Sequence, residues 1–373
     1  MNDLLSLNWR CESASPKPRQ VIAANDTLNA DTAYRLACEG TGLLWQGDFH
    51  NARQLLQALT RRAEKKPIKT AKTATLPPTP AQSFHLHRQA LGQRARILGM
   101  VLVPLNADYS IPLRRAPDLR KACQEAWGPS NGEACMVPLR ELLGLVGAHE
   151  WRKKGVEIAA LGAPPNNRIH PHYGVFSPIR GEYLDLVAST ALPDQQLAFD
   201  IGVGTGVLSA LLVRRGVQHI IATDQDPRAL ACARENLERL HITQVELLQT
   251  NLFPPGRAPL VVCNPPWVPA RPSSPIEHAV YDENSGMLRG FLQGLHEHLT
   301  PDGESWLILS DLAEHLGLRS REELMTWVSE AGLRVLARHD IRPHHKKVSD
   351  TSDPLHIARA KEVTSLWRLG NAA

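Results

Sequence analysis

The sequence of 373 residues lacks the features that direct a chain into or across a membrane. No apolar run approaches the ~20 residues that a bilayer-spanning helix requires. The N-terminal residues contain no basic stretch followed by an apolar one, so we expect no secretory signal. Hydrophobic residues make up 43% and charged residues 21%, which is ordinary for a globular protein. We therefore expect a cytoplasmic protein with no membrane segment.

Cysteine is scarce, and its placement argues against a disulfide framework or a metal site. The six cysteines stand at positions 11, 38, 123, 135, 232 and 263, with no Cys-x-x-Cys pair among them. We expect reduced thiols, with Cys232 and Cys263 buried inside apolar segments. His344 and His345 have no carboxylate or cysteine at a suitable spacing, so we expect a polar loop there and no metal.

Charge is unevenly distributed along the chain. Residues 1–165 contain 22 Lys and Arg against 14 Asp and Glu, a net charge of +8, whereas residues 166–373 contain 20 against 24, a net charge of −4. A basic front half favours contact with a polyanion such as a nucleic acid. The alternative is a solvated surface with a basic linker. The candidate contacts are Arg114, Arg115, Arg152, Lys153 and Lys154.

Composition and periodicity divide the chain into four parts. Residues 1–66 contain apolar positions at helical spacing and predict a small helical unit. Residues 67–82 are rich in Lys, Thr and Pro, as linkers are. Residues 83–165 predict a mixed α/β accessory region, and the stretch Pro164–Asn167 marks its end. In residues 166–373 strand and helix signals alternate, which predicts βαβ units and a parallel sheet.

The elements of this last part can be placed from their patterns. We expect strands at 197–201, 219–223, 244–248, 259–263, 305–310, 335–341 and 364–369. We expect helices at 206–215, 227–240, 287–299 and 321–331. Three of the strands are followed by turns that contain Gly, Asp or Asn-Pro. In a parallel sheet such turns meet at the carboxyl ends of the strands and line one crevice.

The first turn contains glycines at alternate positions. Asp200, Gly202, Gly204 and Gly206 form the pattern D-x-G-x-G-x-G at the end of the first strand. Glycines there let the backbone approach a ligand closely, and the next helix offers free N–H groups. The dinucleotide fingerprint requires a glycine at position 207, where this chain has Val207. This argues against a nicotinamide-dependent oxidoreductase.

The second turn carries two aspartates. Asp224 lies about 20 residues beyond the glycines, where an acidic residue accepts hydrogen bonds from ribose hydroxyls. Asp226 precedes Pro227, a pairing typical of a helix N-cap. We therefore assign the ribose contact to Asp224 and the cap to Asp226.

The third turn indicates the reaction. Asn264, Pro265, Pro266 and Trp267 follow the strand 259–263, and the two prolines cannot continue a hydrogen-bonded ladder. The side-chain carbonyl of Asn and a backbone carbonyl are two acceptors, which suit the two hydrogens of an –NH2 group. The Trp ring offers a face for a planar group. The turn therefore predicts a site for a planar nitrogen nucleophile.

With these turns in sequence, residues 170–370 resemble class I S-adenosylmethionine-dependent methyltransferases. The Asn-Pro-Pro-Trp tetrad is similar to that of enzymes that methylate adenine N6 or the side-chain N5 of glutamine. The resemblance implies an α/β, Rossmann-like sheet that is mostly parallel with an antiparallel last strand. It also implies S-adenosylmethionine as the cofactor.

The resemblance implies roles around the donor. The three glycines would bind its methionine part, Asp200 its amino group and Asp224 its ribose. Phe176 and Pro178, before the first strand, would close over it; the alternative is a packed loop. Asn251 stands where such enzymes often have an acidic residue that contacts the adenine amino group, and its carbonyl can still accept a hydrogen bond.

On the acceptor side, Asn264 and Pro265 would bind the nitrogen, with Trp267 stacking on the group that carries it. Residues 277–292 are similar to the acidic, Gly-containing segment of HemK-type release-factor glutamine methyltransferases. A protein glutamine is therefore the first choice of substrate. The basic front half favours the alternative, adenine N6 in RNA or DNA, which a duplex would have to flip out. A further alternative is an inactive donor-binding module.

Overall fold

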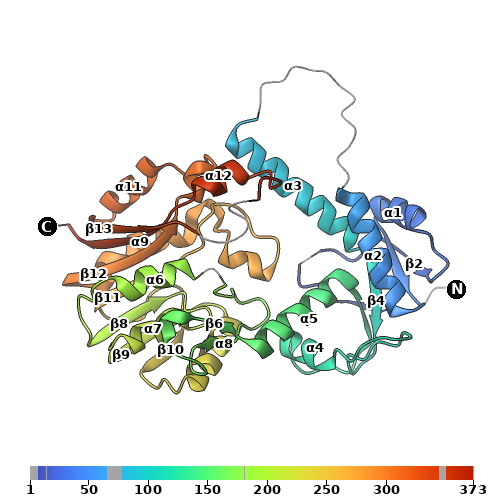
Figure 1. Cartoon of the computed structure of the whole chain (residues 1–373), viewed down its shortest axis with the longest axis horizontal. Helices are drawn as coiled ribbons and strands as arrows, with labels where there is room; N and C mark the ends of the chain where they lie inside the picture. Colours follow the sequence, from blue (N-terminus) through green and yellow to red (C-terminus); the bar gives the residue numbers. More distant parts are fainter. Residues whose placement is uncertain (1–6, 14, 65–77, 180, 344–349, 373) are drawn as a thin grey trace. The chain divides into compact units, whose positions relative to one another are not determined.

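The computed structural model describes residues 7–13, 15–64, 78–179, 181–343 and 350–372. The chain divides into two compact units (Figure 1). Unit 1 contains the described part of residues 1–78 together with residues 85–150. Unit 2 contains residues 79–84 and the described part of residues 151–373.

Unit 1 is built on a mixed sheet in the order β1-β5-β4-β3-β2. Its strands are β1 (Asn8–Trp9), β2 (Gln20–Ala24), β3 (Thr41–Trp45), β4 (Val101–Leu105) and β5 (Cys135–Pro138). Strands β2, β3 and β4 are parallel neighbours, and β5 runs antiparallel to β4. Its helices are α1 (Ala30–Glu39), α2 (Phe49–Glu64) and α4 (Arg120–Trp127), with most of α3 (Pro80–Leu98) and α5 (Leu139–Lys154).

The prediction of a helical unit at 1–66 followed by a separate α/β region at 83–165 is wrong. The two segments share one sheet, because β2 and β3 from the first pair with β4 from the second. Strand β3 is buried at every position, so it shows no alternation that would identify a half-exposed strand. The boundary between the units falls after residue 150. Most of the predicted linker, residues 67–77, lies outside the described residues, and α3 begins at Pro80.

Unit 2 is built on a sheet in the order β10-β9-β8-β11-β12-β14-β13. Its strands are β8 (Leu197–Ile201), β9 (His219–Asp224), β10 (Val245–Gln249), β11 (Ala258–Cys263), β12 (Leu299–Ser310), β13 (Leu333–Ile341) and β14 (Thr364–Asn371). The pairings from β10 to β12 are parallel, and β14 runs antiparallel between β12 and β13. This confirms the predicted α/β, Rossmann-like sheet with an antiparallel last strand.

Helices of unit 2 lie on both faces of this sheet (Figure 1). They are α6 (Glu182–Ser189), α7 (Val207–Arg214), α8 (Pro227–Arg239), α9 (Gly286–His298), α10 (Leu312–His315), α11 (Arg321–Glu330) and α12 (His356–Lys361). The short elements are β6 (Val156–Glu157), β7 (Arg168–Ile169), η1 (Ala159–Leu161), η2 (Pro275–Ala279) and η3 (Glu283–Ser285).

Local sequence signals set several helix ends. Gly40 adopts a left-handed φ of 86° and its N–H caps α1, as a C-terminal glycine should. Asp226 accepts a hydrogen bond from the backbone N–H of Arg228 at the start of α8, which confirms the predicted N-cap. Ser320 and Glu323 form a reciprocal capping box at α11.

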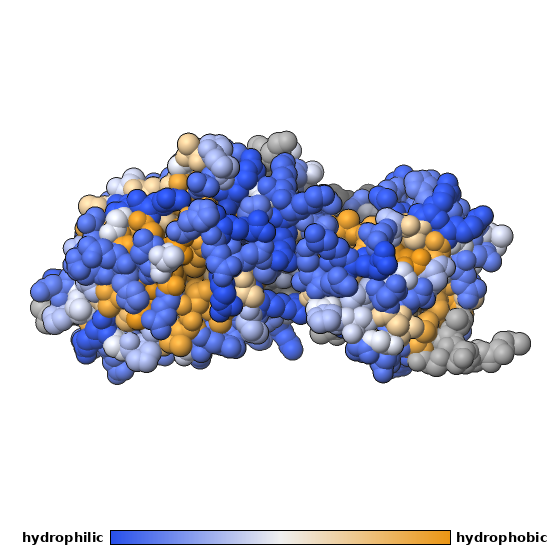
Figure 2. All heavy atoms as spheres, turned by 90° about the horizontal axis from the view of Figure 1, so that it is seen from below, coloured by the Kyte–Doolittle hydropathy of each residue, from blue (hydrophilic) through white to orange (hydrophobic). Residues whose placement is uncertain are grey.

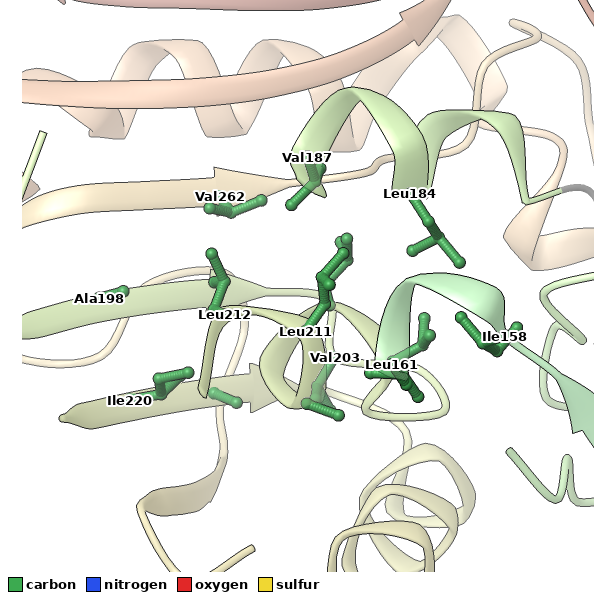
Figure 3. Packing of buried hydrophobic residues seen from close by; sticks show 14 of the residues in the cluster. Ile158, Leu161, Leu184, Val187, Ala198, Val203, Leu211, Leu212, Ile220 and Val262 are labelled. Carbon is green, nitrogen blue, oxygen red and sulfur yellow. The ribbon is translucent and has the colours of Figure 1, made fainter. Parts of the chain in front are cut away.

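The sheet of unit 2 is apolar on both faces, as a covered parallel sheet requires. Ala198 and Val262 belong to one buried cluster with α6, α7 and α8, whereas Phe199 and Val261 belong to another with α9 and α11. Figure 3 shows the first cluster, where Leu212 of α7 points toward Val262 of β11. Burying each Val, Leu or Phe side chain of these clusters contributes about 1.5–3 kcal/mol. This packing holds the strand ends, and the turns that follow them, in place.

The face of the molecule drawn in Figure 2 is mostly polar. Figure 2 shows hydrophilic side chains in blue over one side of both units, with smaller hydrophobic areas in orange between them. Among the described residues, no helix has both the length and the apolar character needed to cross a membrane.

Candidate functional site

Three neighbouring strands bring the predicted turns together. In the order β9-β8-β11, Ile201 pairs with Thr223 on one side and with Cys263 on the other. The glycine turn follows β8, Asp224 ends β9, and the Asn264–Trp267 turn follows β11. All three therefore meet at the carboxyl edge of one parallel sheet, where ligands bind in this class of fold.

The glycine turn is a left-handed backbone segment that requires glycine. Gly202, Gly204 and Gly206 have φ values of 79°, 53° and 80°. A Cβ atom on Gly206 would lie 3.3 Å from both Cα and Cβ of Ala233 in α8. The backbone N–H of Gly202 donates to the carbonyl of Thr223 over 2.9 Å, which joins the turn to β9.

Asp224 closes the other side of the glycine turn. Its Oδ2 accepts a hydrogen bond of 3.1 Å from the N–H of Gly204, and its Oδ1 accepts one of 2.9 Å from the N–H of Asp226. Burial raises the pKa of the Asp224 carboxyl. Each carboxylate oxygen retains a lone pair for a further donor such as a ribose hydroxyl.

Asp200 is fully buried at the end of β8. The hydroxyl of Ser209 donates to its Oδ2 over 2.6 Å, while Oδ1 has no hydrogen-bond partner within the described residues. Burial raises the pKa of this carboxyl to about 6, and the charge of Asp224 adds to the effect. A buried acceptor without a donor is costly. Asp200 is thus suited to a cationic donor such as an ammonium group.

The Asn264–Trp267 turn, called the acceptor turn below, contains an internal hydrogen bond. The indole Nε1 of Trp267 donates a hydrogen bond of 2.9 Å to Oδ1 of Asn264. Trp267 is half-buried and packs against three hydrophobic clusters, and Pro265 and Pro266 are buried. Asn264 Oδ1 keeps one lone pair for another donor. The stacking role of Trp267 stays a prediction.

The remaining predicted donor residues lie outside the three turns. Phe176 is half-buried and Pro178 is buried, in the segment between β7 and α6. Asn251 is exposed just beyond β10, whose Gln249 pairs with Asp224. Asn251 thus lies at the same edge of the sheet as the other site residues.

Sequence reasoning missed Asn236, which ties the glycine turn to the segment before it. This side chain on α8 is 1% exposed. Its Nδ2 donates to the carbonyls of Thr205 (3.1 Å) and His170 (3.2 Å), and its Oδ1 accepts from the N–H of His170 (2.7 Å). A polar residue on the apolar face of the predicted helix 227–240 was the available signal.

Asp282 was also missed, although it lies in the segment flagged by resemblance. Its two carboxylate oxygens accept hydrogen bonds from the N–H groups of Met287 (3.0 Å) and Leu288 (3.1 Å) at the start of α9. Its own N–H donates to the carbonyl of Val268 over 2.9 Å. The Met287 side chain lies against Gly202, 3.1 Å from where a Cβ would be. Asp282 therefore links the acceptor turn to a helix that touches the glycine turn.

Several of the predicted polyanion contacts are engaged in ion pairs. Arg114 pairs with Asp26 at 3.3 Å, and Arg115 pairs with the buried Asp48 at 2.6 Å. Arg152 pairs with Glu235 at 2.5 Å. Both Arg114 and Arg115 remain largely exposed, as do Lys153 and Lys154. The positive field of these residues is weaker than their number suggests.

Within the described part of the chain, no group of three or more His, Cys, Asp or Glu is placed to hold a metal ion. His344 and His345 lie outside the described residues.

Comparison with known proteins finds a family match within unit 2. Residues 166–326 match the family model of the methyltransferase small domain. Domains of this kind take the methyl group from S-adenosylmethionine. The matched segment contains the glycine turn, Asp224 and the acceptor turn.

Two curated relatives match shorter stretches. The ribosomal protein L11 methyltransferase of Clostridium perfringens is 37% identical over 68 residues, which cover 18% of this chain and 22% of the relative. A candidate protein N5-glutamine methyltransferase of Methanocaldococcus jannaschii is 27% identical over 112 residues, or 30% and 55% of the two chains. The chain thus spans about a fifth and about half of the lengths of these relatives.

A solved methyltransferase from Pyrococcus furiosus is 19% identical, with a TM-score of 0.39, and the match covers 61% of this chain and 98% of that one.

Proposed function

Because residues 166–326 match a methyltransferase domain, we propose that the protein is an S-adenosylmethionine-dependent N-methyltransferase. Its acceptor would be a planar amide or amino nitrogen, in the first place the side-chain amide of a protein glutamine. The observation that carries the proposal is the meeting of the glycine turn and the Asn264–Trp267 turn at the ends of neighbouring strands.

The residues present fit the donor. The unpartnered Oδ1 of Asp200 would accept from its ammonium group, and the turn at Gly202 to Gly206 would leave room for its methionine part. Asp224 would accept from the ribose hydroxyls. Asn251 would face the adenine, with Phe176 and Pro178 covering the donor. When bound, the donor supplies a methyl group activated by its positive sulfur.

The acceptor turn would position the nitrogen. The free lone pair of Asn264 Oδ1 and the backbone carbonyl of Pro265 would accept its two hydrogens. Pro266 would keep that carbonyl rigid and Trp267 would hold the planar group. The nitrogen would bond to the methyl carbon as the sulfur–carbon bond breaks, and it would then lose a proton to water. These residues would act by placing the nitrogen within near-attack distance, since Asn264 cannot act as a base.

Glutamine is favoured over adenine by charge as well as by resemblance. Residues 166–373, which contain the acceptor turn, have a net charge of −4, and a nucleic-acid backbone is attracted by the opposite sign. Three of the five candidate cations are already paired. Two of the relatives are also named for protein substrates. Adenine N6 remains the second candidate because residues 1–165 carry +8.

The test is transfer of a radioactive methyl group from the donor to a whole-cell lysate. We expect labelled material that survives nuclease and disappears with protease, and N5-methylglutamine after complete digestion. The Asn264→Ala variant should leave the lysate unlabelled while it still binds the donor in calorimetry. Label lost with nuclease would overturn the glutamine proposal in favour of adenine. If the protein does not bind the donor, both the glutamine and the adenine proposals would be overturned.

A further inference from the structure

We propose that Phe84 is a positioning residue for the acceptor turn, and that the N-terminal end of α3 (residues 80–84) supports the methyltransferase site. Phe84 lies well before the segment 166–326 that matches the family. By packing, residues 79–84 belong to unit 2 rather than to the unit that contains the rest of α3. The expected effect of Phe84 on methyl transfer rests on the proposed function, whereas its contacts with the acceptor segment do not.

Phe84 is buried against the chain that follows the acceptor turn. It is 3% exposed, and its ring centre lies 6.4 Å from that of Tyr281, with the planes inclined at 58°. Phe84 shares a buried cluster with Val268, and Trp267 and Tyr281 pack against this cluster. The other members of the cluster are Leu312, Leu316, Leu355 and Ala358.

Phe84 contacts a short two-stranded contact between Val268 and residues 280–282, which directly follows the acceptor turn and is called the clasp below. Val268 forms an isolated parallel bridge with Tyr281. The N–H of Val268 donates to the carbonyl of Val280 over 3.2 Å, and the N–H of Asp282 donates to the carbonyl of Val268 over 2.9 Å. A shift of Tyr281 therefore moves Val268, which follows Trp267 directly.

Two backbone hydrogen bonds are too few to hold such a clasp in one geometry, because even a complete two-stranded hairpin is marginally stable in water. Side-chain packing must supply the rest. Among the described residues of the cluster, Phe84 alone comes from outside residues 151–373. The indole of Trp267 donates a hydrogen bond to Oδ1 of Asn264. Packing at Phe84 would therefore affect the position of the oxygen that is proposed to accept the N–H of the acceptor.

The experiment compares Phe84→Ala and Phe84→Leu with Leu98→Ala in the full chain. Leu98 is a matched control, because it is 5% exposed on the same helix but belongs to unit 1. Hydrogen exchange is followed at the amides of Val268 and Asp282. We expect exchange at both to quicken about tenfold or more in Phe84→Ala, to change less in Phe84→Leu, and to stay unchanged in Leu98→Ala.

Donor binding and methyl transfer are then measured on the same proteins. In Phe84→Ala the Kd for S-adenosylmethionine should stay within about twofold, because the glycine turn is untouched, while kcat falls about 100-fold, as a small misplacement of reacting groups does. Phe84→Leu should recover part of kcat. Unchanged exchange in Phe84→Ala, or equal effects in Leu98→Ala, would overturn the proposal. If exchange quickens in Phe84→Ala but the wild-type protein methylates no acceptor, the proposed function alone would be overturned.

Discussion

The indole Nε1 of Trp267 donates a hydrogen bond of 2.9 Å to Oδ1 of Asn264, the atom proposed to receive the acceptor nitrogen. The bond fixes which way the Asn264 amide faces, since the oxygen must point to the indole. It also occupies one of the two lone pairs on that oxygen. The acceptor –NH2 group would share the oxygen with Trp267, so the Trp side chain sets the direction from which the nitrogen can approach.

Replacing Trp267 by Phe should separate this hydrogen bond from the aromatic face. The Phe ring keeps a surface for stacking but has no N–H donor. A neutral hydrogen bond contributes about 1 kcal/mol, so we expect kcat to fall roughly fivefold, with the donor Kd unchanged. Steady-state kinetics and calorimetry measure both. A variant faster than wild type would mean that the indole competes with the acceptor for Asn264.

Donor binding should depend on pH through Asp200. The pKa of its buried carboxyl is raised to about 6, and only the charged form attracts an ammonium group. Below pH 6 the protein must release a proton to bind the donor. The Kd for the donor should therefore rise about tenfold for each unit by which the pH falls. Calorimetry from pH 5 to 8 measures the slope. The isosteric Asp200→Asn variant should bind more weakly with no such slope, and a persistent slope would assign the proton to another group.

The same carboxyl should affect stability in the direction opposite to most acids. Its folded pKa of about 6 exceeds the value of about 3.9 for an unfolded Asp, so the folded state binds the proton first. The stabilisation from this group is complete below about pH 3.9 and is lost as pH rises through 6. Urea unfolding of wild type and Asp200→Asn should therefore show a difference that grows from pH 4 to pH 7 in favour of the variant. A constant difference would contradict the raised pKa.

Much of unit 2 could be predicted because its signals are local. Each site strand is an apolar run that ends in a recognisable turn, and the predicted strand 197–201 coincides with β8. The antiparallel last strand was inferred from the resemblance rather than from periodicity, and the strand order was not predicted. Unit 1 could not be predicted in the same way. Strand β3 is buried at every position and lies between two amphipathic helices, so it gives no alternating pattern.

The residues that sequence reasoning missed act through contacts distant in sequence. Asp282 matters because its N–H reaches Val268 and its carboxylate reaches Met287 and Leu288. Phe84 matters because it packs on Tyr281. No pattern along the chain records these pairings. They depend on tertiary packing, which single-sequence reasoning does not reach.

Asn236 should be essential to the shape of the glycine turn. Replacement by Ala removes the hydrogen bonds to Thr205 and His170 and leaves buried backbone groups without partners. We expect the free energy of unfolding to fall by about 2–3 kcal/mol and the donor to bind at least tenfold more weakly. The exposed Asn131, whose hydrogen bonds are local, supplies the control, and Asn131→Ala should change neither quantity. Wild-type donor affinity in Asn236→Ala would show that the turn keeps its shape without this link.

Two alanine substitutions in the glycine turn and one in α3 form a graded test. Gly204→Ala introduces strain at φ 53°, but its Cβ would meet nothing closer than 3.9 Å. We therefore expect the free energy of unfolding to fall by about 1–2 kcal/mol. Gly206→Ala adds contacts of 3.3 Å with Ala233, whose Cα belongs to the backbone of α8 and cannot move aside easily, so its loss should be larger. Gly92 lies inside α3 with open space around it, and Gly92→Ala should stabilise the chain by up to about 1 kcal/mol. Urea unfolding ranks the three variants. Equal losses at 204 and 206 would show that the strained φ alone, and not the contact with α8, makes glycine necessary in this turn.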